Sequence, residues 1–213
     1  MIEPIEIGVT SLQSALNCPL CFWISQNIGS PPSIFAGITV QMDSVIKNHM
    51  RPFIGGSDLP KWFPVRGTLL DTSRTMRAKD PDTGVTLKGI LDALVRTPDG
   101  EYHIIDYKTG KPSGEVPNYY QMQLDGYAYL LEQNGLRPVG SGVLLYFTPA
   151  RGDILEELFP FKITAVRAKV DSGRIPSILA HAKQIIESKA PPPRSEDCEM
   201  CMWREQVGQT LSE

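Results

Sequence analysis

The spacing of hydrophobic and polar positions predicts helices towards both ends of the chain and strands in its middle. Apolar side chains recur at helical spacing over residues 10–28 and 38–50, and the first helix is expected to break at Pro19, which fits only a helix end or a kink. From residue 67, short apolar runs separated by turn residues are typical of strands. In chain order the expected elements are helices 10–28 and 38–50, strands 68–79, 85–96 and 101–108, helix 119–134, strands 139–149 and 154–163, and helix 164–188.

This order of elements favours an α/β or α+β fold with a mixed central sheet flanked by helices. The first three strands are expected to form an antiparallel meander. With 213 residues, the chain is long enough to bury a substantial core. We therefore expect a single domain over 1–213, in which residues 1–30 and 190–213 form a terminal lobe.

The composition argues against a protein that coats nucleic acid or spans a membrane. Hydrophobic residues make up 41% of the chain, and the net charge is −3, so binding to phosphates would require a local basic surface. One basic stretch precedes the central strands, and it fits either a phosphate-binding surface or solvated faces. Its residues are Lys47, Arg51, Lys61, Arg66, Arg74, Arg77, Lys79 and Lys88.

No apolar run approaches the length of about 18 residues that a membrane span needs. The N-terminus has acidic residues and lacks the basic region of a secretory signal. We therefore expect a cytoplasmic protein with reduced thiols, and no membrane partner. In that setting, paired cysteines indicate metal ligands rather than disulfides.

The stretch from Gly89 to Gly110 concentrates charge in an apolar setting. It is predicted to form two strands joined by a turn, with Asp92 in the first strand and Asp106 and Lys108 in the second. Side chains two residues apart share one face of a strand, so Asp106 and Lys108 should point the same way. Unpaired buried charge is costly, which leaves two explanations: a divalent cation between the carboxylates, or a buried salt bridge.

The central stretch and the helix after it together carry a family resemblance. Gly89-x-x-Asp92, Asp106-Tyr107-Lys108 and Gln123-x-x-x-Tyr127, with paired cysteines at both ends, resemble the RecB-like branch of the PD-(D/E)xK nucleases. That branch includes the CRISPR-associated RecB-like nucleases and the AddB nuclease domain. The resemblance implies a restriction-endonuclease-like core and Mg²⁺- or Mn²⁺-dependent hydrolysis of DNA, on single strands or DNA ends. It also implies a place in repair, recombination or CRISPR-type processing, for instance as an exonuclease working with a helicase, repair proteins or CRISPR adaptation proteins.

The resemblance also assigns roles to individual residues. It implies that Asp92 and Asp106 bind the metal ion, that the Tyr107 backbone carbonyl is a further ligand, and that Lys108 is the catalytic lysine. Gln123 and Tyr127 lie four positions apart on the following helix, hence on one face, and would flank the active site. Tyr127 also fits an apolar stripe, so packing in the core is an alternative role for it.

One position departs from the family pattern. The family usually has a His or Glu on an early helix as a further metal ligand, and no His stands at the obvious place in this sequence. Asp43 supplies a ligand-type oxygen on the 38–50 helix, with Gln41 and His49 as alternatives in other registers. If Gln41 were the equivalent, the metal site would be weaker, and the protein would act as a catalytically weak or inactive DNA-binding module.

The four cysteines form a second candidate site. Cys18-x-x-Cys21 and Cys198-x-x-Cys201 supply four thiolates, enough for a closed tetrahedral site that clamps the terminal lobe together. By general frequency such a set binds Zn²⁺. The resemblance instead implies a 4Fe-4S cluster, although the family's usual split is one N-terminal cysteine and three C-terminal ones.

Overall fold

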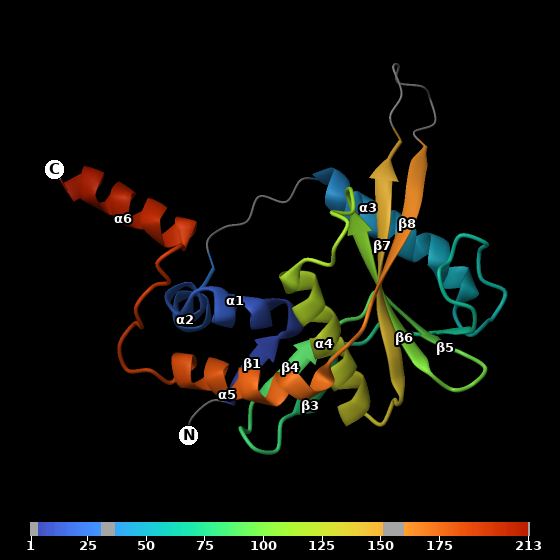
Figure 1. Ribbon diagram of the computed structural model, residues 1–213, viewed down its shortest axis with the longest axis horizontal. Coiled ribbons are helices and arrows are strands. Elements are labelled where there is room, and N and C mark those ends of the chain that lie inside the picture. Colours follow the sequence, from blue (N-terminus) through green and yellow to red (C-terminus); the bar gives the residue numbers. More distant parts are fainter. Residues whose placement is uncertain (1–3, 31–36, 151–159, 213) are drawn as a thin grey trace.

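The computed structural model describes residues 4–30, 37–150 and 160–212, with the side chains of 37–39 and 212 left out. Its elements confirm a mixed α and β fold with helices on both faces of the main sheet (Figure 1). The strands are β1 Glu6–Gly8, β2 Thr68–Leu70, β3 Met76–Lys79, β4 Thr86–Gly89, β5 Ala93–Arg96, β6 Tyr102–Thr109, β7 Val139–Pro149 and β8 Phe161–Ala168. The helices are α1 Leu12–Asn17, α2 Pro19–Asn27, α3 Gly37–Met50, α4 Asn118–Gln133, α5 Ile175–Ile186 and α6 Glu199–Ser212, with 3₁₀ turns at Val9–Ser11, Arg51–Phe53 and Ser172–Arg174. No helix among the described residues is long and apolar enough to cross a membrane.

The main sheet has the strand order β2-β5-β6-β7-β8 and is mixed, because β6 and β7 run parallel while the other neighbours are antiparallel. Its two faces bury separate cores. Ile104 of β6 packs in the core that includes α4 and α5, whereas Ile105 and Tyr107 pack in the core under α3. The period of two along β6 therefore assigns alternate residues to opposite sides of the sheet.

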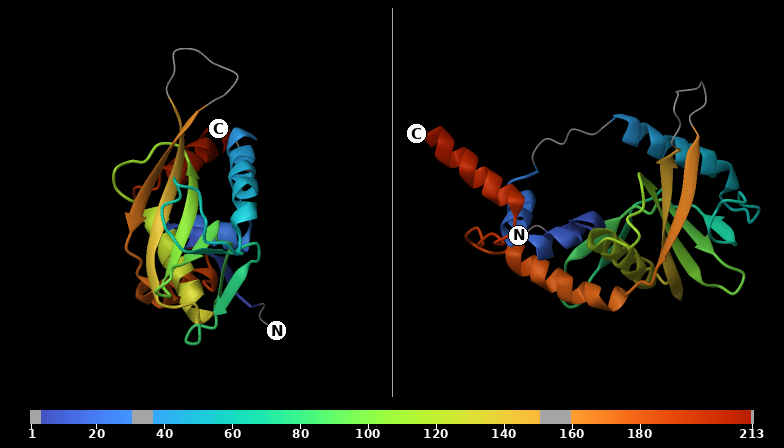
Figure 2. Two further views of the ribbon diagram at one scale, coloured as in Figure 1. Left: turned by 90° about the vertical axis from the view of Figure 1, so that its right-hand side faces the viewer. Right: turned by 45° about the horizontal axis from the view of Figure 1, so that its top comes forward.

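A small sheet, β1-β4-β3, packs against α4 beside the main sheet (Figure 2). Gly89, at the end of β4, allows a close approach: a Cβ there would lie 2.9 Å from the Tyr127 ring and 3.0 Å from Val9. Only glycine fits so tight a contact, because any side chain would displace the helix or the N-terminal segment. Gly89 thereby brings the end of β4 against the helix that carries Gln123 and Tyr127.

The predicted strands 68–79 and 85–96 were wrong as single strands. Each is two strands that belong to different sheets, so the expected single meander is absent. The first is interrupted where the Asp71 side chain accepts a hydrogen bond from the Ser73 N–H at 2.9 Å, a local turn that competes with strand pairing. The second leaves the small sheet at Gly89 and enters the main sheet at Ala93.

The C-terminal prediction was also partly wrong. Most of the predicted strand 154–163 lies outside the described residues, and β8 continues to Ala168, inside the predicted helix 164–188. Pairing with β7 along its length holds these residues in the sheet. The helix begins at Ile175, with Pro176 in the first turn, where its missing N–H costs nothing. The break at Pro19 and the helices near 38–50 and 119–134 were predicted correctly, whereas α6 was not predicted.

A buried carboxylate fixes the turn between β3 and β4 to α4. Asp80 is 1% exposed; it accepts hydrogen bonds from the Thr83 N–H and hydroxyl at 2.9 and 2.6 Å, and from the Tyr129 hydroxyl at 2.8 Å. Burial raises the pKa of Asp80, but these hydrogen bonds outweigh burial, and the pKa lies below its ordinary value.

Tyr129→Phe should therefore lower the free energy of unfolding by about 1–3 kcal/mol at pH 7, because one buried carboxylate oxygen loses its donor. Because the pKa of Asp80 is lower in the folded protein than in the unfolded chain, its ionised carboxylate stabilises the fold at pH values above the unfolded pKa. This contribution is lost as the pH falls through the pKa of Asp80 in the folded protein. Urea unfolding should show the difference persisting at neutral pH and shrinking only in strongly acidic solution. Equal stability of the two proteins at pH 7 would contradict this role of Tyr129.

Candidate active site

The structure brings Asp106, Lys108, Gln123 and Tyr127 together between β6 and α4. Asp106 is 2% exposed, and its Oδ2 lies 2.5 Å from the Lys108 ammonium. Gln123 donates to Asp106 Oδ1 at 2.9 Å and accepts from Lys108 at 3.2 Å. Gln123 thus fixes both charged groups at once.

Tyr127 supports this arrangement from one turn further along α4. Its hydroxyl accepts a hydrogen bond from Gln123 at 3.1 Å and donates to the Ile90 carbonyl at 2.8 Å. The side chain is 5% exposed, and burial raises its pKa, so the hydroxyl stays protonated. Tyr127 therefore packs in the core and also connects Gln123 to the segment that leads to Asp92.

The position of Asp92 differs from the prediction. It lies in a bend just before β5 rather than within a strand. Its Oδ2 accepts a hydrogen bond from the Tyr107 N–H at 2.9 Å, beyond the point where β5 pairs with β6. The Asp92 carboxylate thus replaces the backbone carbonyl that would accept the next hydrogen bond if the pairing of β5 with β6 continued. This contact holds Asp92 beside Asp106.

The early helix reaches the site through a residue whose role the sequence did not reveal. Lys47 of α3 lies 2.9 Å from Asp43 Oδ2 and 2.9 Å from Asp92 Oδ1, so one ammonium bridges the two acids. Sequence reasoning grouped Lys47 only with a basic stretch, although its spacing of four from Asp43 was visible. Of the alternatives, Gln41 is exposed and His49 stacks near Trp62 with ring centroids 6.0 Å apart.

The electrostatics of this cluster favour an added cation. Burial raises the pKa of Asp106 to about 6, although the Lys108 ammonium acts in the opposite direction. Among the described residues, Asp106 Oδ2 is paired only with the Lys108 ammonium, 2.5 Å away. Three carboxylates, Asp43, Asp92 and Asp106, face two lysines, and carboxylate oxygens are the donors that hard divalent cations prefer. The donor types therefore suit a divalent metal ion, although in the described part of the chain these three carboxylates do not gather as closely as the four cysteines do.

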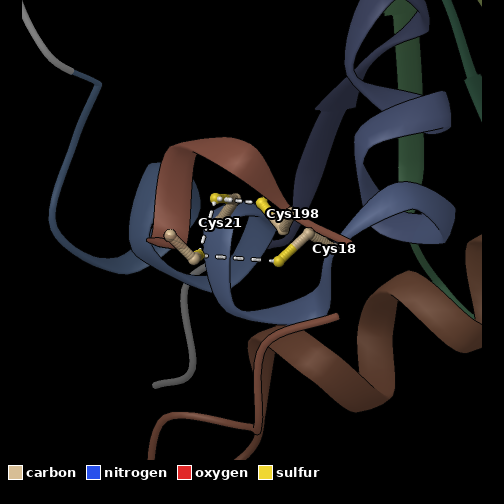
Figure 3. A group of neighbouring side chains, drawn as sticks. Cys18, Cys21 and Cys198 are labelled. Atoms are coloured by element: carbon tan, nitrogen blue, oxygen red, sulfur yellow. Dashed lines mark hydrogen bonds between the residues drawn. The ribbon is translucent and has the colours of Figure 1, made fainter. Parts of the chain in front are cut away.

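The four cysteines gather as predicted, at the junction of α2 and α6 (Figure 3). Their Sγ atoms all lie within 4.8 Å of one another, with Cys18–Cys201 at 3.8 Å, Cys21–Cys198 at 3.7 Å and Cys21–Cys201 at 3.3 Å. Burial raises the pKa of Cys18, but hydrogen bonds from the N–H groups of Cys21 and Ser195 outweigh it and lower the pKa to about 6. In the described residues, no other Cys, His, Asp or Glu side chains gather in threes this closely.

Comparison with known proteins identifies the class of this fold and site. The sequence model described as the PD-(D/E)XK nuclease superfamily matches residues 53–206, most of the chain. The chain therefore belongs to the PD-(D/E)XK nuclease superfamily, as its resemblance predicted. Nucleases of this superfamily use divalent metal ions. The matched region contains both aspartates of the central stretch but begins after α3 and after the first cysteine pair.

Two solved structures are similar to this chain, and the first shows a related fold. A crystal structure described as that of SSO0001 has a TM-score of 0.52 and 19% sequence identity, covering 96% of this chain and 86% of that one. An alkaline exonuclease from Laribacter hongkongensis is more distant, with a TM-score of 0.43 and 13% identity, covering 97% of this chain and 93% of that one. No curated protein matches this chain. Assignment to the RecB-like branch stays a prediction.

Replacing Lys47 should strengthen metal binding. In Lys47→Met the carboxylates of Asp43 and Asp92 lose their internal cation, so Mn²⁺ should bind the metal-free protein about tenfold more tightly. Electron paramagnetic resonance of free Mn²⁺ during a titration measures this affinity. Lys79→Met, on β3, is the control and should bind like wild type. Weaker Mn²⁺ binding by Lys47→Met would mean that Lys47 instead positions the ligands.

Proposed function

We propose that this protein is a metal-dependent nuclease that hydrolyses phosphodiester bonds of DNA, with Mg²⁺ or Mn²⁺ as cofactor. The observation that carries the proposal is the buried Asp106 carboxylate, which contacts Lys108 and Gln123 and lies beside Asp92. So costly a group is retained in a core only where it is paired or has a chemical role. Membership of the nuclease superfamily supports the same reading.

Each side chain then has a role. Asp92 and Asp106 hold the metal ion, with Asp43 and the Tyr107 carbonyl as further ligands. When bound, a divalent ion polarises the phosphodiester and lowers the pKa of a bound water. Lys108 is held between Gln123 and the Tyr120 ring, 4.0 Å below its ammonium. So placed, Lys108 orients the attacking water or offsets charge that develops on the phosphate.

The substrate follows from the resemblance and from local charge. The net charge of −3 makes a uniform basic coat impossible, so DNA must be bound by the basic residues near the site. Lys47 lies on α3 and Arg51 in the 3₁₀ turn that directly follows it, and both border one cavity together with Asp92. Single strands or DNA ends are the substrate that the RecB-like resemblance implies, in repair, recombination or CRISPR-type processing, with a helicase or an adaptation protein as partner.

A second function has one observation in its favour. Lys47 already occupies the space between Asp43 and Asp92, so the protein needs no metal ion to neutralise that pair. A protein that keeps this lysine in place when Mg²⁺ or Mn²⁺ is present would bind DNA without cutting it.

Cleavage of labelled single-stranded DNA with Mn²⁺ separates the two functions. Asp106→Asn and Lys108→Met should each lower the rate of cleavage by about a hundredfold or more, the size typical of losing one group that stabilises the transition state. Asp99→Asn, at an exposed turn, is the matched control and should cut like wild type. If wild type and both site variants cut DNA at the same rate, the activity belongs to a contaminant. If none of the three proteins cuts DNA while wild type binds it, the protein is the non-cleaving DNA-binding module.

We propose that the cysteines hold a single Zn²⁺ ion. With Zn–S bonds of about 2.3 Å, the sulfurs at the corners of a tetrahedron lie about 3.8 Å apart. Three of the Sγ–Sγ distances, 3.3, 3.7 and 3.8 Å, are close to this edge. In a 4Fe-4S cluster each thiolate binds a different iron, so the four sulfurs must lie much farther apart. The geometry therefore favours zinc over the cluster implied by the family resemblance.

Metal analysis of protein purified without oxygen tests this choice. We expect about one zinc ion per chain, no visible absorbance, and loss of the zinc in Cys198→Ser, since a structural site needs all four ligands. Zinc release can be followed with a colorimetric chelator. Brown protein that contains iron and acid-labile sulfide would show that the cluster is the correct assignment.

A further inference from the structure

A cavity of about 270 Å³ opens beside Asp92, on the α3 side of the main sheet. Leu69, Leu91 and Tyr107 line it. Lys47 of α3 and Arg51, in the 3₁₀ turn that follows α3, also border it. The cavity thus combines apolar walls with two cations next to a candidate metal ligand. This combination suits a ligand that has an apolar, flat part and an anionic part.

Two further features indicate that the cavity receives a ligand. Ile54 and Ile90 border the cavity and are 44% and 51% exposed, so an apolar surface faces solvent there. Tyr107, only 8% exposed, has a hydroxyl with no hydrogen-bond partner among the described residues. A buried unpaired hydroxyl costs free energy, and a polar ligand in the cavity would offset that cost.

We propose that this cavity binds one nucleotide of single-stranded DNA, next to the phosphate at the metal site. The base contacts the exposed side chains of Ile54 and Ile90, with Tyr107 lining the cavity beside it, and the adjacent phosphate pairs with Lys47 and Arg51. The proposal rests on the proposed function for the position of the scissile phosphate. A base within a duplex is stacked and paired, so it cannot enter, and this makes the site selective for single strands.

The selectivity follows from the position of the cavity relative to the carboxylates. Lys47 contacts Asp92 and also borders the cavity, so a phosphate held by Lys47 lies within reach of the ligand cluster. A strand that places a base in the cavity is thereby aligned for cleavage at the neighbouring phosphate. The cavity determines where the strand lies, and Asp106 and Lys108 provide the chemistry.

Binding without a metal ion tests the subsite separately from cleavage. In EDTA, Ile54→Asp should weaken the affinity for a fluorescent single-stranded oligonucleotide about tenfold, because the carboxylate removes a stacking surface and repels phosphate. Ile28→Asp, at an exposed isoleucine at the end of α2, is the matched control and should bind like wild type. Equal affinities of the two variants would overturn the proposal, as would equal competition by a duplex of the same sequence.

Photo-crosslinking gives a second readout that does not depend on a substitution. An oligonucleotide carrying 5-iodouracil should crosslink to the peptide that contains Tyr107, and crosslinks that map only elsewhere would overturn the proposal. If binding and crosslinking occur as expected but no DNA is cut with Mn²⁺, the subsite stands and the proposed nuclease function fails. If DNA is cut but Ile54→Asp binds like Ile28→Asp, the subsite fails and the nuclease function stands.

Discussion

The structure depends on placing a carboxylate inside the interface between a central strand and a helix. Asp106 lies on β6, which pairs on both sides with other strands, so the backbone cannot move to expose the side chain. The surroundings must therefore compensate for its charge. Lys108 supplies the opposite charge from the same strand face, and Gln123 satisfies both groups from α4. This requirement explains why α4 packs here and why Gly89 must stay small.

Asp92 connects the two sides of the sheet. Alternation along β6 directs Asp106 towards α4 and Tyr107 towards α3, so neither face alone could assemble the whole acidic cluster. Asp92 directly precedes β5. One of its carboxylate oxygens accepts a hydrogen bond from the Tyr107 N–H, and the other forms an ion pair with Lys47 of α3. A residue in the middle of a strand would face only one side. The break before β5, which looks like an irregularity in the sheet, thus gives the site access to both layers.

The sequence predicted those parts of the site that depend on local periodicity. Asp106 and Lys108 share a strand face because side chains repeat every two residues, and Gln123 and Tyr127 share a helix face because they lie four apart. Long-range packing was not predictable in the same way. The division of residues 85–96 between two sheets depends on the contact of Gly89 with α4, and the extent of β8 depends on pairing with β7. Lys47 was overlooked because its two partners lie on different elements.

The cysteine site has a consequence for how the chain matures. Cys21 and Cys198 lie 177 positions apart, so the ligand set is completed only after nearly the whole chain has been synthesised. At a translation rate of about 5–20 residues per second, the second cysteine pair is made about ten seconds or more after the first. Until then the chain can offer an ion only two of the four thiolate ligands. An ion bound by all four thiolates therefore marks a chain that was made through Cys201 and whose two ends have met.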